Sequence, residues 1–161
     1  MACLVFLSRT YHLEQRLGSA LENEIDQLRG VLWSERDPQG RVFVSLADAY
    51  RRMGDLPLAR SMIEEGLERL PDFASAHVVA GWIHQDLVSP VEAEEAFRRV
   101  LDLDPENTIA LEAMGGLAGA RGSHAEAAEY LRRLSALDPG AGDGDDANVE
   151  TAGDGAKPTL S

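Results

Sequence analysis

Three prolines recur at an interval of 34 residues, and this period constrains the fold more than any other feature of the chain. Pro71, Pro105 and Pro139 each end a leucine-rich run, as in "EEGLERLP", "RVLDLDP" and "RRLSALDP". A fixed period of this length is typical of a chain built from stacked copies of one supersecondary unit. Alignment on the prolines divides the chain into three units, residues 40–73, 74–107 and 108–141.

Several columns of the aligned units hold residues of one kind, which indicates how each unit folds. Large side chains such as Phe43, Tyr50 and Phe97 stand at the fourth, eleventh and twenty-fourth positions. The eighth and twentieth positions hold small residues, namely Ala47, Gly81, Gly115, Ala59, Ala93 and Ala127. Small residues let two antiparallel helices approach closely, and large ones fill the space beside that contact. Each unit is therefore predicted to be a helical hairpin.

This pattern resembles the tetratricopeptide repeat, in which a large residue, Leu-Gly, Tyr, Ala, an aromatic or aliphatic residue and Pro recur at fixed offsets. The segment "FVSLADAYRRMGDLPLARSMIEEGLERLP" of the first unit matches best, whereas His77, His84 and Ala118 depart from the pattern. The resemblance covers about 100 of the 161 residues. It implies an all-α, right-handed solenoid of three helical hairpins over residues 40–139.

The segments that flank the repeats, residues 1–39 and 140–161, have different predicted roles. A stripe of apolar residues predicts an amphipathic helix that caps the first unit, with "RDPQG" as the connector. The stripe consists of Leu13, Leu17, Leu21, Ile25, Leu28 and Leu32. The alternative is that the stripe forms a coiled-coil or dimer seam. The acidic tail from Gly140 has few apolar side chains to bury, so it is predicted to be disordered.

The charge balance argues against two classes of partner. The net charge is −13, whereas a nucleic-acid backbone and an anionic membrane surface both attract clustered Lys and Arg. We therefore expect neither nucleic acid nor membrane as a partner. The apolar run "ACLVFL" is too short to span a bilayer, and a cytoplasmic protein is predicted. The alternative is a longer upstream extension, of which this run would be the end of a signal.

No motif for catalysis or for cofactor binding can be found in the sequence. A glycine-rich phosphate loop, a paired metal-binding motif and a nucleophile elbow are all missing, and the single Cys3 cannot form an internal disulfide. His77 and His84 are seven residues apart and share one helix face, so a metal site is an alternative. They stand in columns that hold core residues in the other units, so packed core histidines are predicted. We expect no enzyme, no cofactor and no metal.

Local signals mark helix ends and surface pairs. Gly54 and Gly122 are expected to end first helices in a left-handed conformation, and Asp104 with Pro105 to start the first helix of the third unit. Ser89 is expected to cap the second helix of the second unit. Ion pairs four residues apart are expected on exposed helix faces, namely Glu65–Arg69, Glu94–Arg98, Glu95–Arg99 and Glu129–Arg133.

The resemblance also implies where a partner binds, because the first helices of such repeats line a concave groove. The matching positions give an apolar centre that includes Trp82, with Arg51 and Arg52 toward one end. A Trp in such a patch is the type of anchor that dominates interfaces. The predicted partner-binding residues are Val44, Asp48, Arg51, Arg52, Val78, Val79, Trp82, Gln85, Ile109 and Glu112.

The predicted function is that of a non-catalytic scaffold or adaptor that binds a protein or peptide segment in this groove. The Lys and Asn clamp of chaperone-binding repeats is missing, because its columns hold Val44, Asp48, Val79, Ile109 and Ala113. One alternative is that the N-terminal helix or a second copy fills the groove. Another is self-assembly, as a homodimer formed through the uncapped last repeat or the N-terminal helix.

Overall fold

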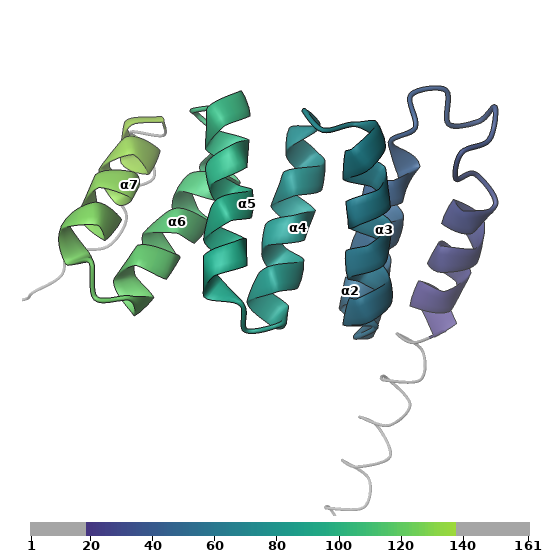
Figure 1. Ribbon diagram of the computed structural model, residues 1–161, viewed down its shortest axis with the longest axis horizontal. Coiled ribbons are helices and arrows are strands. Elements are labelled where there is room, and N and C mark those ends of the chain that lie inside the picture. Colours follow the sequence, from purple (N-terminus) through teal and green to yellow (C-terminus); the bar gives the residue numbers. More distant parts are fainter. Residues whose placement is uncertain (1–18, 138–161) are drawn as a thin grey trace, which may run out of the picture.

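The computed structural model describes residues 19–137, and every regular element in this part is an α-helix. A helix over residues 19–29 comes first. It is followed by α2 (Val42–Met53), α3 (Leu56–Arg69), α4 (Ala74–Asp86), α5 (Pro90–Leu103), α6 (Thr108–Ala120) and α7 (His124–Leu137). These helices form three hairpins that follow one another in a row, and within the row α5 lies in front of α4 and α6 in the view of Figure 1. The prediction of an all-α solenoid of three hairpins is confirmed. The predicted tail, Leu13 and Leu17 lie outside the described residues.

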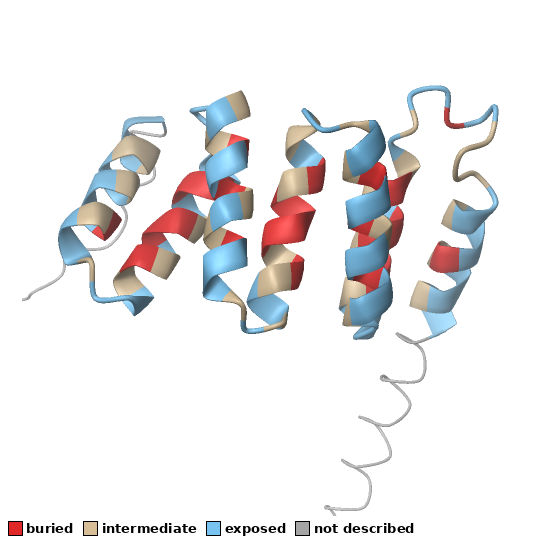
Figure 2. Cartoon of the chain, in the orientation of Figure 1, coloured by how far each residue is buried: buried red, intermediate tan, exposed pale blue. Residues whose placement is uncertain are grey.

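The row is held together by contacts within each hairpin and between successive hairpins. The pairs α2–α3, α4–α5 and α6–α7 pack as hairpins, and α3–α4 and α5–α6 join one hairpin to the next. Buried residues lie on the faces that these helices turn toward one another, and the outer faces are exposed (Figure 2). Phe43, Ile63 and Ile83 belong to one buried cluster, and Phe97 and Met114 to a second.

Small residues allow the close helix contacts that the sequence predicts. A Cβ atom on Gly81 of α4 would lie 2.5 Å from the ring of Phe97 on α5. A Cβ atom on Gly66 of α3 would lie 2.0 Å from the ring of Phe43 on α2. Both rings are fully buried. In these two hairpins the aromatic ring therefore occupies the space that a side chain on the opposite helix would need.

The turns inside the hairpins share one backbone conformation with different residues. Gly54 and Gly122 have φ angles of 87° and 82°, as predicted for glycines that end first helices. Val88 occupies the same column in the second unit and also has a positive φ, of 57°. Its side chain is 85% exposed. A β-branched residue is strained in this conformation, so the turn geometry is imposed by the hairpin rather than by the local residue.

Capping side chains start two of the helices, and a buried carboxylate holds the backbone before a third. Asp55 accepts a hydrogen bond from the Leu58 amide at the start of α3, and Asn107 accepts one from Ala110 at the start of α6. Asp37 is buried and accepts from the amides of Arg41 and Val42, ahead of α2.

Two of the cap predictions were wrong. Asp104 does not start α6 but ends α5, and its carboxylate accepts from Asn107 Nδ2 at 3.1 Å. Asn107, three residues later, provides the cap of α6. Ser89 stands at the N-cap of α5, but its side chain makes no capping hydrogen bond there. Pro90 opens that helix, and its fixed φ suits the first helical position.

The helix over residues 19–29 packs at one end of the row, beside the first hairpin (Figure 1). Ile25 is 4% exposed and belongs to the cluster that includes Phe43. Leu28, Leu32 and Trp33 pack against the same cluster, and the ring of Trp33 stacks on Phe43 at 5.7 Å. This part of the leucine stripe is therefore engaged with the first hairpin, and it does not lie across α4 and α6.

The turn at Pro71 is joined to the following helix by a histidine. The Nε2 atom of His77 lies 2.7 Å from the carbonyl oxygen of Pro71. His77 and His84 are both half-buried rather than fully packed in the core, which differs from the prediction. In the column of His77 the other units have Phe43 and Leu111, which are buried. A polar residue remains partly exposed there because its ring nitrogen reaches the turn.

Two predicted ion pairs form within helices, and two arginines instead reach back to an earlier turn. Arg98 and Arg69 pair with Glu94 and Glu65, four residues before them. Arg99 pairs with Asp72 at 2.7 Å, and Arg133 donates to the carbonyl of Pro105 at 2.7 Å. Both of these arginines occupy the same column of their units, so one side chain links each of the later hairpins to the proline turn before it.

Candidate partner-binding face

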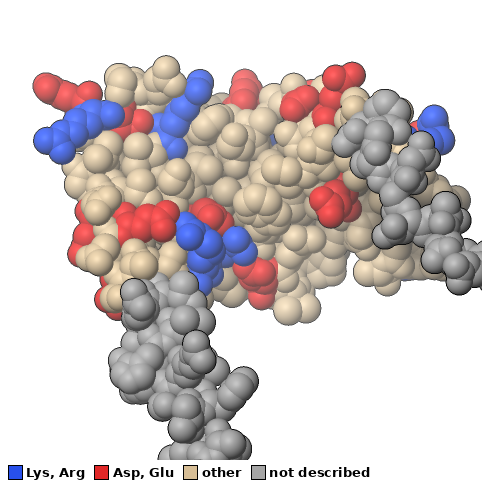
Figure 3. Space-filling model, turned by 180° about the vertical axis from the view of Figure 1, so that it is seen from behind, with Lys and Arg blue, Asp and Glu red and all other residues tan. Residues whose placement is uncertain are grey.

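The first helices of the three hairpins form one continuous surface, which we call the first-helix face. It consists of the outward positions of α2, α4 and α6, on the side away from α3 and α5. Figure 1 shows α5 in front of α4 and α6, so the reversed view in Figure 3 presents this face. Uncharged atoms cover much of this face, acidic atoms also lie within it, and basic and acidic atoms gather together nearer its lower edge (Figure 3).

Trp82 lies where the two buried clusters meet. It is partly buried and packs against both clusters, one centred on the first hairpin and one on the second and third. The guanidinium of Arg51, from α2, lies 5.5 Å from the centre of its ring. The indole is therefore held from two sides while part of it stays accessible on α4. An aromatic ring in such a position has a fixed orientation and a large apolar surface, which suits a binding anchor.

Arg51 and Arg52 belong to a chain of ion pairs that crosses three helices. Arg51 pairs with Asp48 and with Asp86 of α4, both at 2.9 Å. Arg52 pairs with Asp48 at 3.0 Å and with Glu24 of the N-terminal helix at 2.9 Å. Burial lowers the pKa of Arg51, but hydrogen bonds to Asp86 and Asp48 more than offset this and raise it above the ordinary value. Both arginines are already neutralised, so they do not present free positive charge to a ligand.

Sequence reasoning missed the role of Asp86 in this chain. The repeat alignment contained a signal for this contact, because Asp86 stands one position further along the second unit than Arg51 does along the first unit. Adjacent positions on neighbouring first helices lie close when the hairpins stack in register. The pair then links the first hairpin to the second.

Two of the predicted groove residues are not open to solvent. Val78 and Val79 are each 5% exposed. Val78 packs in the cluster with Phe97, and Val79 in the cluster with Phe43. The prediction that both valines line an open surface was wrong, because the helices that pack against α4 enclose the two side chains in these clusters. Val44, on α2, is half-buried against the first cluster.

The other predicted residues reach the surface. Ile109 is 42% exposed, and Gln85 and Glu112 are also exposed. Asp48 is half-buried within the ion-pair chain. Ile109 and Glu112 are three residues apart on α6 and share one side of that helix. Trp82 is thus partly accessible on α4, Ile109 and Glu112 are exposed on α6, and Arg51, Arg52 and Asp48 form a neutralised group of which Arg51 lies beside Trp82.

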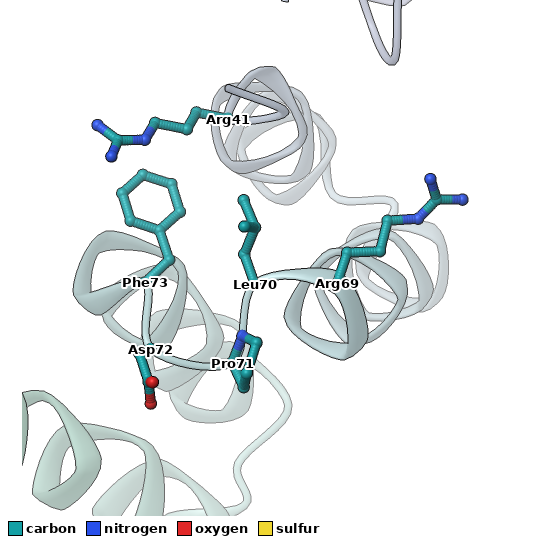
Figure 4. A pocket seen from close by; sticks show the side chains of 6 residues that line it. All are labelled: Arg41, Arg69, Leu70, Pro71, Asp72 and Phe73. Atoms are coloured by element: carbon teal, nitrogen blue, oxygen red, sulfur yellow. The ribbon is translucent and has the colours of Figure 1, made fainter. Parts of the chain in front are cut away.

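Two pockets lie at the junctions between successive hairpins. One, of about 290 Å³, is at the turn between α3 and α4 and is lined by Arg41, Arg69, Leu70, Pro71, Asp72 and Phe73 (Figure 4). The Arg41 side chain extends over the Phe73 ring at 4.9 Å, and the Arg69 side chain points away from both. Asp72 is paired with Arg99. No pair of acidic and basic groups converges in this pocket as general acid–base chemistry would need.

A second pocket, of about 320 Å³, lies between the start of α5 and the end of α6 and includes Val91, Leu117 and Arg121. The guanidinium of Arg121 is engaged by Glu94 and Glu126. Over residues 19–137 no group of His, Cys, Asp and Glu is arranged to hold a metal ion. In the same part of the chain, no helix is both long and apolar enough to cross a bilayer.

The comparison with known families decides the identity of the fold. The profile of the tetratricopeptide repeat matches residues 44–108 and 89–142, which together make up more than half of the chain. The chain belongs to the tetratricopeptide repeat family. Tetratricopeptide repeats are typically non-catalytic modules for protein interaction, so the family points to a protein as the partner.

Known relatives of this tetratricopeptide repeat chain share parts of its sequence or its fold. It is 36% identical over 92 residues to cellulose synthase operon protein C of Xanthomonas axonopodis pv. citri (strain 306). The match spans 57% of the chain but only 6% of that protein.

The crystal structure of MamA superposes with a TM-score of 0.64 at 19% identity, over 78% of this chain and 73% of that one. A MamA fragment of Desulfovibrio magneticus RS-1 gives a TM-score of 0.59 at 22% identity, over 80% and 75%. At these identities the likeness concerns the fold.

Proposed function

We propose that this chain is a non-catalytic scaffold or adaptor module that binds a segment of a partner protein on its first-helix face. The observation that supports this most directly is the position of Trp82, half-buried at the junction of the two clusters and in contact with Arg51. Ile109 extends the accessible apolar surface onto α6. A cytoplasmic location remains a prediction from the sequence.

The ion-pair chain supports the same proposal in a different way. Asp48, Arg51 and Asp86 join α2 to α4, and Arg52 with Glu24 joins α2 to the N-terminal helix. Cross-helix pairs of this kind hold neighbouring hairpins at one relative orientation. A preformed surface loses less conformational entropy when it binds, so more of the contact energy appears as affinity.

Site-specific photo-crosslinking tests the proposal. A photoreactive residue placed at Ile109 should give partner adducts in cells, and the same residue placed at Val91 on α5 should not give those adducts. Val91 is a suitable control because it is 66% exposed and lies on a second helix. The Trp82→Ala substitution should remove the adducts at position 109, provided that circular dichroism shows an intact helix content. Adducts that persist unchanged in Trp82→Ala would contradict the proposal.

A second candidate function, self-assembly, is favoured by one observation on α7. Leu131 is 50% exposed, whereas Ile63 and Phe97 in the same column are 1% and 0% exposed. In the first two units, helices of the following hairpin help to bury the residue at this position. Within the described residues, no helix follows α7 to bury Leu131 in the same way. A second copy of the chain would bury Leu131. Sedimentation that gives a monomer at high micromolar concentration would exclude this candidate.

A further inference from the structure

We propose that the segment bound on the first-helix face is both apolar and basic, with Lys or Arg side chains beside its apolar anchor. This inference rests on the proposed function and adds the chemistry of the partner. It depends on how charge is distributed over the face, which differs between its two halves.

The half of the face formed by α4 and α6 has no positive charge of its own. Neither helix contains a Lys or an Arg, and their only carboxylates are Asp86 and Glu112. Both carboxylates are exposed. Glu112 shares one side of α6 with Ile109, and Asp86 pairs with Arg51, which lies over the Trp82 ring. Within these two helices the accessible apolar side chains are therefore accompanied by negative charge alone, and the cation beside Trp82, Arg51 of α2, is already paired with Asp48 and Asp86.

The half of the first-helix face formed by α2 does not supply the positive charge that α4 and α6 lack. Arg51 and Arg52 are held by Asp48, Asp86 and Glu24 at 2.9–3.0 Å. An acidic ligand would have to break these pairs before either arginine could contact it, and it would also meet the carboxylate of Glu112. The face is thus arranged against an acidic segment, and like-charge contacts of this kind suppress the wrong partners.

A basic segment meets no such obstacle. Asp86 is paired with Arg51 through one oxygen, and its side chain is 41% exposed, so it can accept further hydrogen bonds from a cation. Glu112 is exposed near the start of α6, one turn after Ile109. A Lys or Arg one helical turn from the apolar residue that contacts Trp82 or Ile109 would reach one of these two carboxylates.

Three synthetic peptides of about 15 residues, the length at which helices become marginally stable, test the inference. They share one stripe of Leu and differ only at the polar positions, which are all Lys, all Gln or all Glu. Fluorescence anisotropy with the full chain at physiological salt gives the affinities. The Lys peptide should bind about tenfold or more tightly than the Glu peptide, with the Gln peptide between them.

Matched variants separate the face from the general acidity of the chain. Glu112→Gln and Glu95→Gln change the net charge equally, and Glu95 is an exposed residue of α5 on the other side. Glu112→Gln should weaken binding of the Lys peptide by about two- to fivefold, the range for an exposed ion pair, and Glu95→Gln should leave it unchanged. Equal losses in the two variants would overturn the inference.

The outcomes distinguish this inference from the proposed function. If the three peptides bind equally and Trp82→Ala weakens all of them, the face binds apolar segments and the preference for basic ones is wrong. If no peptide binds, or if Trp82→Ala leaves every affinity unchanged, both proposals are wrong. Preferential binding of the Lys peptide that depends on Trp82 and Glu112 supports both.

Discussion

Gly81 on α4 faces the buried ring of Phe97 on α5, so closely that a Cβ atom at position 81 would lie 2.5 Å from the ring. The corresponding glycine of the third unit, Gly115, faces Leu131, and a Cβ atom there would lie 3.6 Å from the nearest atoms. The same column is therefore tight in one hairpin and open in the next, because Phe and Leu differ in size and burial.

The Gly81→Ala and Gly115→Ala variants should consequently change stability in opposite directions. In Gly81→Ala, crowding against Phe97 costs about 1–3 kcal/mol, which exceeds the gain of roughly 1 kcal/mol in helix propensity. In Gly115→Ala the propensity gain remains, so the free energy of unfolding should rise by about 0.5–1 kcal/mol. Urea denaturation of both variants measures the difference. A Gly81→Ala protein more stable than the wild type would contradict the close packing of Gly81 against Phe97.

The strained turn at Val88 gives a second pair of matched variants. Val88→Gly should raise the free energy of unfolding by about 0.5–1 kcal/mol, because relief of left-handed strain outweighs the chain entropy of glycine. Gly54→Val should lower it by at least about 1 kcal/mol. Nothing lies within 4 Å of a Cβ atom at Gly54, so this loss reports backbone strain alone. Thermal melts of both proteins check the two signs.

Asp37 should contribute more to stability than an ordinary helix cap. It is buried and accepts from two amides, at 2.8 and 3.1 Å, whereas the exposed Asp55 accepts from one at 3.2 Å. We expect Asp37→Ala to cost about 2–3 kcal/mol, since two partly buried amides lose their acceptor, and Asp55→Ala to cost about 1 kcal/mol. Equal losses in urea denaturation would indicate that the connector before α2 is not ordered by Asp37.

Alanine substitutions in one column test whether the last hairpin is covered in solution. Ile63→Ala should cost about 2–5 kcal/mol, because Ile63 is 1% exposed. Leu131→Ala should cost about 1 kcal/mol in a monomer, because half of its side chain is already in water. The measurement is denaturation at several protein concentrations. A loss at Leu131 as large as at Ile63, together with a dependence on concentration, would instead favour self-assembly.

The helical hairpins could be predicted in detail because they depend on local and periodic features. The proline period located the three units, and Gly54 and Gly122 marked the ends of first helices. The small residues of the eighth column, such as Gly81, indicated where helices approach closely. Each of these signals concerns residues within one unit, where the spacing along the chain fixes which side chains meet.

The properties of the candidate site were harder to predict, because they depend on contacts between units. Val78 and Val79 stand at positions of the predicted groove, but the neighbouring helices bury both. The sequence placed Arg51 and Arg52 toward one end of the groove but did not show that Asp86 and Glu24, which are 35 and 28 residues away in the sequence, pair with them. The position of a residue in the repeat assigns it to one side of a helix. Its exposure, and whether its charge is neutralised, depend on the side chains of the adjacent helices.

The same distinction, between features within one repeat unit and contacts between units, applies to the whole molecule. The order of helices, their pairing into hairpins and the family follow from the repeated pattern, since the same spacing of small and large residues favours the same hairpin each time. Only the stacked structure shows that Arg99 pairs with Asp72 rather than with Glu95, or that Leu131 remains half exposed in a column that is otherwise buried. The partner of a long charged side chain depends on which groups lie near it in space. The burial of a residue depends on how many helices surround its position. A pattern along the sequence contains neither of these two pieces of information.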